Sequence, residues 1–498
     1  MRNSVWSEPA MTERLERSRA GPPTVFVGDR ALHSRYDPRR EAETYLAGLD
    51  IPGGIRFFIL PEPGLGYLIP ALKRRFPGAG IIALHVSPFL AQKQGELNPG
   101  AAVWPRDAGA SPEGVQDFLE RNIPDLPAAQ VRIVEWRPAR EAFGEACLSL
   151  LRETAAFLRR ADANARTGGF FGRRWVRNFF RNLPLLRRIV RYRPAGPDIP
   201  WIVAGAGPSL EESAAAIRER GGSALVLAAA SAYAALAERG AAGDLVLAAD
   251  GGAWALFHLV EALRRAGTAG GPGPVIAFSL TAALPSQCGD FPLLPLSDGT
   301  LWQGLVLREL GIPFLSLPSR GTVTALAVDL ALRLTGGDVL LAGMDLSRRD
   351  IQAHARPYAL DPFLDGGEGR LSPRYSRAFS RSMIPDGGSF RVYADWFKGQ
   401  LARWPERLRS LGANHPVFGV LPPPDRAWGE AVTQSPWSPV PFRPLPLRRG
   451  IDALCTALEG PAPALVSELA PLLLPDSPDP SPAELVVELR ALTAAAHG

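Results

Sequence analysis

Residues 201–210 read WIVAGAGPSL, an apolar run that enters a glycine-containing turn. Such a run between turn residues is typical of a buried strand. Gly205 and Gly207 allow the backbone to approach its neighbours closely. Pro208 suits the first position of a helix, and Ser209 offers a hydroxyl to the helix amides. The stretch therefore predicts a strand, a tight turn and a helix, the repeating unit of parallel α/β sheets.

The same turn is a candidate phosphate site, because the free amides at a helix N-terminus attract an anion. Its spacing matches neither the GxGxxG fingerprint nor a Walker loop, since no Lys-Ser or Lys-Thr pair follows it. Taken alone, the turn is therefore compatible with a phosphate site and with a simple tight corner.

Strand and helix patterns alternate on both sides of this turn. Toward the N-terminus, a strand at 56–60, a helix at 68–76 and a strand at 80–86 predict a βαβ unit. Around the turn itself, strands are expected at 201–204, 224–229, 245–249, 275–279, 314–317 and 339–342. This alternation predicts an α/β protein with a Rossmann-like central domain, an N-terminal α/β domain and a C-terminal helical segment.

The length of 498 residues exceeds what one ordinary core holds. We expect an N-terminal α/β domain over residues 1–140 and a helical connection with a basic amphipathic helix over 141–195. A central Rossmann-like, nucleotide-binding domain is expected over 196–420, followed by a proline-rich linker and a helical tail over 421–498.

Composition points to a cytoplasmic protein. The three cysteines, Cys147, Cys288 and Cys455, are far apart and predict neither a disulfide framework nor a cysteine-based zinc site. No export signal begins the chain, and it has no apolar run of 18 residues, so no transmembrane segment is expected.

One segment is strongly basic: residues 173–193 hold eight arginines and no acid. The pattern predicts an amphipathic helix whose apolar side faces the protein and whose arginines face water. Its predicted apolar residues are Trp175, Val176, Phe179, Phe180 and Leu183. Pro184 is expected to end or kink this helix. An acidic partner or an anionic membrane surface is the alternative interpretation.

Polar or glycine-rich turns follow three more of the predicted strands. They are Asp250-Gly251-Gly252, Ser319-Arg320-Gly321-Thr322 with Thr324, and Gly343 with Asp345. Ligands of open parallel sheets bind outside the carboxyl ends of the strands. Each turn alone is more often a capping or turn feature. Together they predict one nucleotide site, because a carboxylate directly after a buried strand needs a partner.

The order of several segments resembles one known family, the motility-associated factor glycosyltransferases, whose core is shared with the archaeal 6-hydroxymethylpterin diphosphokinases. The core segments are IVAGAGPSL at 202–210, the run at 224–250, GTVTALAVDLALRLTGGDVLLAGMDLS at 321–347, and QAHA at 352–355. LHSRYDPRREA at 32–42, FFGRRWVRNFFRNLP at 170–184 and FRVYADWFKGQLAR at 390–403 also match. The resemblance covers roughly residues 28–402.

The resemblance implies a bacterial enzyme that O-glycosylates flagellin. It would move a nonulosonic (sialic-like) acid from its CMP-activated form to a Ser or Thr hydroxyl. The core would be similar in plan to bacterial CMP-sialic acid transferases. The implied partners are a nucleotide-activated sugar and flagellin or another flagellar protein, with no nucleic acid, and no metal or other cofactor is required.

Site residues follow from the same resemblance. His354 would be the catalytic base, because a histidine with its ordinary pKa of about 6.5 suits proton removal. The turn at 205–209 would border the nucleotide phosphate, and Arg320 would stabilise the leaving CMP. Two departures are Ala206, where the sialyltransferases have Asn, and Met344, where the motility-associated family has Gln. The predicted nucleotide site comprises Gly205, Gly207, Pro208, Ser209, Ser231, Asp250, Gly251, Ser319, Arg320, Gly321, Thr322, Thr324, Gly343 and Asp345.

Two other functions remain open. One is an ATP-dependent diphosphokinase acting on a pterin-like alcohol, which would need Mg²⁺ on carboxylates such as Asp250 and Asp345. The Asp250-Gly251-Gly252 motif also resembles thiamine diphosphokinases. The other is a non-catalytic nucleotide-binding assembly protein. The long N-terminal part favours a large protein acceptor over a small diphosphokinase.

Overall fold

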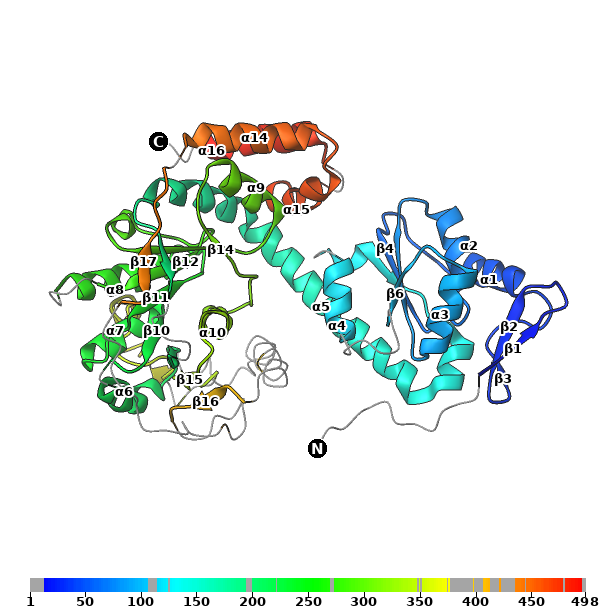
Figure 1. The fold of residues 1–498 in the computed structure, drawn as a ribbon, viewed down its shortest axis with the longest axis horizontal. Helices are drawn as coiled ribbons and strands as arrows, with labels where there is room; N and C mark the ends of the chain where they lie inside the picture. The colour runs from blue at the N-terminus through cyan, green and yellow to red at the C-terminus, as the bar shows by residue number, and fades with distance from the viewer. Residues whose placement is uncertain are drawn as a thin grey trace. The chain divides into compact units, whose positions relative to one another are not determined.

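In the computed structural model the chain divides into two compact units, residues 1–168 and 169–498 (Figure 1). The structure describes residues 13–105, 114–123, 126–193, 199–220, 222–268, 273–346, 349, 352–373, 375–376, 397, 406–412, 421, 435–443, 445–477 and 480–494. The boundary between the units falls within the long helix α5 (Arg137–Asn182). The finer division into four segments stays a prediction.

Unit 2 is built on an eight-stranded sheet in the order β14-β13-β12-β11-β10-β9-β15-β16. All neighbouring strands in it are parallel. The strands are β9 (Trp201–Ala204), β10 (Leu225–Ala229), β11 (Leu245–Ala248), β12 (Val275–Ser279), β13 (Leu293–Ser297), β14 (Leu315–Ser316), β15 (Val339–Ala342) and β16 (Leu408–Ser410). The predicted α/β class and Rossmann-like plan are therefore confirmed.

Alternating residues of these strands form two apolar cores. Ile202 and Ala204 of β9 face one core, whereas Trp201 and Val203 face the other. The first core is covered by α6 (Leu210–Glu219), α7 (Ala230–Glu238), α8 (Ala255–Thr268) and α9 (Leu301–Glu309). The second is covered by α10 (Val323–Leu334). Figure 1 shows α6, α7 and α8 on one side of the strands and α10 on the other.

Sheet order reverses at β9. From β9 the chain adds strands in one direction as far as β14, and α10 then returns it to β15 on the other side of β9. The carboxyl ends of β9 and β15 therefore lie side by side at the topological switch point, the usual ligand position in open α/β sheets.

Two strands of this sheet were not predicted. β13 contains Pro295, which normally argues against a central strand. The structure tolerates it because the short neighbour β14 pairs only with Leu296 and Ser297, so no β14 residue faces Pro295. β16 holds three residues, too few for a periodic pattern.

The first half of the basic segment, residues 173–182, forms the end of α5. Val176, Phe179 and Phe180 are buried in the first core, and the helix ends at Asn182, before Pro184. The arginines of this segment lie mostly at the surface. A short 3-10 helix, η2 (Leu183–Leu185), follows. Residues 173–182 are therefore helical with an apolar inner side, whereas Arg187, Arg188, Arg191 and Arg193 follow the helix.

The C-terminal tail is helical, as predicted, and packs on the first core. It comprises α14 (Leu447–Glu459), α15 (Pro463–Leu473) and α16 (Pro482–Ala494). Before it, β17 (Trp437–Pro439) pairs with β8 (Val190–Tyr192). Most of the predicted proline-rich linker lies outside the described residues. The remaining elements of unit 2 are η3 (Ser286–Asp290) and α11 (Asp361–Asp365).

Unit 1 contains the predicted βαβ unit within a parallel sheet of order β6-β5-β4-β7. Its sheet strands are β4 (Phe57–Pro61), β5 (Gly80–Leu84), β6 (Ala102–Trp104) and β7 (Val131–Ile133). Its helices are α1 (Pro38–Ala47), α2 (Leu68–Arg75), α3 (Pro88–Leu97), α4 (Val115–Asn122) and η1 (Ala128–Gln130). β1 (Glu13–Arg17), β2 (Pro23–Val27) and β3 (Arg30–Ala31) form a small antiparallel sheet.

A buried hydrogen bond between Glu62 and His85 links the strand ends of unit 1. The fully buried Glu62 lies 2.9 Å from His85 Nδ1 through Oε1, and its Oε2 accepts from the Val86 amide at 2.6 Å. These contacts hold the loop after β4, which includes the Gly64–Gly66 turn, as part of the core. Within the described residues, no helix is long and apolar enough to cross a membrane.

Candidate active site at the sheet switch point

The glycine turn after β9 and the Gly343–Asp345 turn after β15 meet directly. The Gly207 amide donates to the Gly343 carbonyl at 2.7 Å. Asp345 Oδ2 accepts from the Ser209 amide at 3.1 Å and from the Ser209 hydroxyl at 2.8 Å. Four of the residues predicted from separate stretches of sequence thus lie together, at the sheet position predicted for the site.

Glycine is required on both sides of this contact by close backbone approach. A Cβ at Gly343 would lie 2.3 Å from the Gly205 carbonyl oxygen, and Gly343 has a φ of +61°. A Cβ at Gly207 would lie 2.0 Å from Asp345 Oδ2. The glycines are therefore required for the packing of the two strand ends, whether or not a ligand binds there.

Asp345 accepts hydrogen bonds from the Ser209 amide and hydroxyl, the donors that were predicted to face a phosphate. A carboxylate beside a buried strand end needs hydrogen bonds, and Ser209 supplies two of them. A phosphate at the same donors would meet a like charge on Asp345. The predicted phosphate contact of Ser209 stays a prediction, and it requires Asp345 to share these donors.

The loop that carries His354 is held on the same turn. The Ala355 amide donates to the Ala206 carbonyl at 2.8 Å. Glu211 Oε1, at the start of α6, accepts from Gln352 Nε2 at 2.6 Å and from the Arg356 amide at 2.9 Å. His354 is thereby placed beside the glycine turn, although it is distant from that turn in sequence.

His354 belongs to a stack of three rings. Its imidazole is parallel to the Tyr358 ring, with centroids 4.2 Å apart and an interplanar angle of 7°. Tyr358 in turn packs on His258 of α8 at 5.0 Å, and its hydroxyl lies 3.4 Å from His258 Nε2. Stacking of this kind fixes the orientation of the His354 ring.

The inner members of the stack are neutral near pH 7. Burial, with help from the charge of His354, lowers the pKa of His258 to about 4, although Asp250 acts in the opposite direction. Burial also raises the pKa of Tyr358 to about 12. Within the described residues His258 Nδ1 is buried without a hydrogen-bond partner. His258 is therefore a neutral ring at the buried end of the stack.

This shift predicts an acid-dependent loss of stability. The pKa of His258 falls from 6.5 in the unfolded chain to about 4 in the folded protein. Between these values only the unfolded chain binds the proton, so stability falls as the pH drops through this window. His258→Phe keeps a ring against Tyr358 and should lose less thermal stability from pH 6.5 to 4 than the wild type. Parallel melting curves of the two proteins would contradict the assignment.

Of the remaining predicted residues, only Thr324 is shown in contact with this centre, and the others have local partners. Thr324 approaches Gly205 closely enough to contact a Cβ built there at 3.3 Å. Thr322 caps α10 by accepting from the Ala325 amide, and Asp250 Oδ1 accepts from the Gly252 amide at 2.7 Å. The other positions are Ser231 in the first turn of α7, Pro208 buried, Ser319 exposed, Gly321 at a φ of +75°, and Gly251 packed on Trp175.

Arg320, predicted to stabilise the leaving group, is paired within the protein. Its Nε donates to Asp329 Oδ2 at 2.8 Å, and Asp329 on α10 is only 2% exposed. Arg333 also donates to Asp329, at 3.0 Å. Its predicted role at the nucleotide stays a prediction, and it requires Arg320 to serve the ligand beside a buried carboxylate.

Sequence reasoning missed His258, Glu211 and two asparagines of α5. Asn178 donates to the carbonyls of Gly251 and Thr281, and Asn182 donates to those of Leu280 and Ala282. Both asparagines lie in the basic segment, whose predicted features were its arginines and its aromatic residues. Their only sequence signal is that they are uncharged polar residues on the apolar side of an amphipathic helix.

Sheet order separates the two strand-end carboxylates. Asp250 follows β11 and Asp345 follows β15, and β10 and β9 lie between these strands. Three strand spacings amount to about 14 Å. Two carboxylates that ligate the same Mg²⁺ ion have oxygens only about 4 Å apart. The strand order therefore does not support one ion held by both residues.

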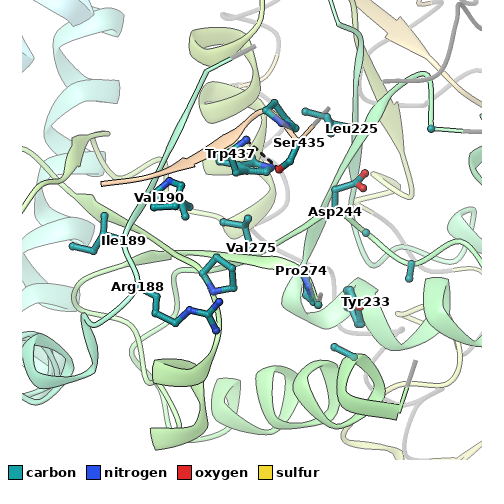
Figure 2. Close-up of a pocket in the computed structure, with 18 of the residues that line it drawn as sticks. Arg188, Ile189, Val190, Leu225, Tyr233, Asp244, Pro274, Val275, Ser435 and Trp437 are labelled. Atoms are coloured by element: carbon teal, nitrogen blue, oxygen red, sulfur yellow. Dashed lines mark hydrogen bonds between the residues drawn. The ribbon is translucent and has the colours of Figure 1, made fainter. Parts of the chain in front are cut away.

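A separate cavity of about 750 Å³ lies at the amino-terminal ends of the strands, opposite the switch-point site (Figure 2). Leu225 and Val275, the first residues of β10 and β12, line it together with Trp437 of β17. Arg220 and Asp244, 3.0 Å apart, form an ion pair in its wall. None of the predicted site residues lines this cavity, so it is distinct from the switch-point site.

The fold and the switch-point contacts define a Rossmann-like α/β protein with a strand-end site. Residues 173–350 match the family model described as 6-hydroxymethylpterin diphosphokinase MptE-like, so this part of the chain is similar to MptE-like domains. The matched residues span β9 to β15 and both turns of the switch point. It confirms the predicted resemblance to this core.

Two individual proteins are also similar to the chain. An uncharacterized protein of Treponema pallidum (strain Nichols) is 26% identical over 345 residues, which are 69% of this chain and 73% of that protein. The solved structure of the MAf glycosyltransferase from Magnetospirillum magneticum AMB-1 aligns with a TM-score of 0.47 at 14% identity. That alignment covers 98% of this chain and 86% of the other.

Proposed function

We propose that this protein is a glycosyltransferase that moves a nonulosonic acid from a CMP-activated donor to a Ser or Thr hydroxyl of flagellin. The observation that carries the proposal is the hydrogen bond between the Ala355 amide and the Ala206 carbonyl, 2.8 Å long. It joins the glycine turn, where the donor nucleotide is expected, to the histidine expected to act as base. The collinear resemblance to motility-associated glycosyltransferases supplies the reaction.

The chemistry of this transfer suits the groups at the switch point. Sialyl transfer passes through an oxocarbenium-like state, and CMP leaves as an anion. Amides and hydroxyls at the strand ends would stabilise that anion without a metal ion. The acceptor hydroxyl loses its proton as its oxygen bonds to the anomeric carbon, and neutral His354 would receive that proton.

The ring stack supports the role of His354. A general base works only when its nitrogen is aimed at the acceptor proton. Tyr358 holds the imidazole parallel at 4.2 Å, and Tyr358 is itself packed on His258. The base would therefore be oriented before the acceptor arrives, with no charged neighbour in the stack at neutral pH.

A second candidate is an ATP-dependent diphosphokinase, which the description of the matched family model favours. This reaction transfers a diphosphoryl group and relies on Mg²⁺ to neutralise phosphate charge. Asp250 or Asp345 would each have to ligate such an ion without the other, given the strands between them.

Nucleotide preference separates the two candidates. We expect CMP to raise the melting temperature of the purified protein, and EDTA to leave this increase unchanged, because a ligand that binds the folded state stabilises it by mass action. ATP should have little effect, with or without Mg²⁺. Differential scanning fluorimetry with each nucleotide, with and without Mg²⁺, is the measurement. An Mg²⁺-dependent preference for ATP would replace the transferase with the diphosphokinase.

A further inference from the structure

A patch of exposed aromatic rings lies beside the histidine stack. Trp254, Phe257 and Phe363 are 62%, 37% and 50% exposed. Their ring centroids are 4.6 Å apart for Phe257 and Phe363, 5.6 Å for Trp254 and Phe363, and 5.8 Å for Trp254 and Phe257. These three residues form the ring patch. Contiguous exposed aromatic surface of this kind marks interaction sites.

The ring patch lies outside the buried cores. Within the described residues, none of its three members is among the buried residues of the two apolar cores of unit 2. Trp254 stands in the turn before α8, and Phe363 stands on the short helix α11. The rings contact one another and leave part of each ring exposed to solvent.

The patch is continuous with the candidate catalytic centre. Phe257 directly precedes His258 on α8. Phe363 is tied to Tyr358 through Asp361, whose amide donates to the Tyr358 carbonyl at 2.9 Å and whose Oδ2 accepts from the Tyr358 amide at 3.2 Å. The patch is therefore connected to the stack through His258 and through Tyr358, which stacks on His354.

We propose that the ring patch is the docking surface for the acceptor polypeptide, which it holds by apolar side chains next to the target hydroxyl. This inference rests on the proposed function, because it takes His354 as the base for that hydroxyl. Large rings at the centre of an interface supply most of its binding energy. A protein acceptor uses such an anchor, because a Ser or Thr hydroxyl alone offers little to bind.

The test compares binding of the acceptor with use of the donor. Trp254→Ala, Phe363→Ala and the double variant should raise KM for purified flagellin of the source organism, about tenfold or more in the double variant. The kcat at saturating flagellin, the affinity for CMP and the release of CMP without acceptor should stay within about twofold of wild type. Val487→Ala, which removes an apolar side chain 69% exposed on α16, is the matched control and should leave KM unchanged.

Several results would overturn the inference. One is an unchanged KM for flagellin in the double variant. A weakened CMP affinity would place the rings at the donor site. A changed oligomeric state, measured by light scattering, would make the patch an interface between two copies of the chain. If the wild type releases no CMP from the donor, the proposed function fails. Direct binding of flagellin, measured by biolayer interferometry, then tests the docking surface independently of activity. Loss of flagellin binding in the double variant supports the docking surface, and binding equal to that of the wild type rejects it.

Discussion

Replacing His354 with alanine should lower turnover on flagellin by about 10²–10⁴-fold, or about 3–5 kcal/mol of activation free energy, the contribution of one general base. Donor affinity should change little, because the side chain is expected to act on the acceptor proton. The measurement is kcat with saturating donor and flagellin, together with CMP affinity by calorimetry.

His354→Phe is the matched control for this prediction. It keeps a flat ring in the position that stacks on Tyr358 at 4.2 Å, but it cannot accept a proton. If His354 is the base, the phenylalanine variant should be as slow as the alanine variant. It should also lose the acid limb of the pH–rate profile, because that limb reports the fraction of neutral imidazole. Wild-type turnover in either variant would move the base to Asp250, Asp345 or Tyr358.

Gly343→Ala should be the most destabilising single substitution at the switch point. Its φ of +61° costs an alanine about 1–2 kcal/mol. The added Cβ would also lie 2.3 Å from the Gly205 carbonyl and 2.8 Å from Leu210 Cβ. Overpacking of this kind costs about 1–3 kcal/mol more. Because the displaced Gly205 backbone belongs to the glycine turn, CMP binding should be lost as well.

Gly311→Ala separates the two contributions. Gly311 has nearly the same φ, +64°, but an added Cβ there has no heavy atom within 4 Å. The two variants should therefore share the cost of the backbone conformation and differ by the cost of the contact. Unfolding free energies from guanidinium titration give the difference. Equal destabilisation of the two variants would show that the close contact between Gly343 and Gly205 adds nothing to the cost.

Much of the fold was predictable because local pattern decides it. The apolar runs of β9, β12 and β15 stand at the residues expected, and Pro184 marks the end of α5 by geometry that no tertiary contact can change. The positions of Gly205, Gly207 and Gly343 after their strands were equally readable. β13 was not predicted; it tolerates Pro295 because the short neighbouring strand β14 pairs only with Leu296 and Ser297.

The arrangement of the site was less predictable, because it depends on which strand ends become neighbours. The sequence by itself determined that turns with small or acidic residues follow parallel strands, and that a histidine follows the last of them. Only the tertiary structure decided that β15 returns beside β9, and hence that Ser209 faces Asp345 while Asp250 stands about three strands away. It also brought His258 from α8 to the Tyr358 ring. These contacts join residues about 100 or more positions apart, and strand order is set by long-range packing that no local pattern records.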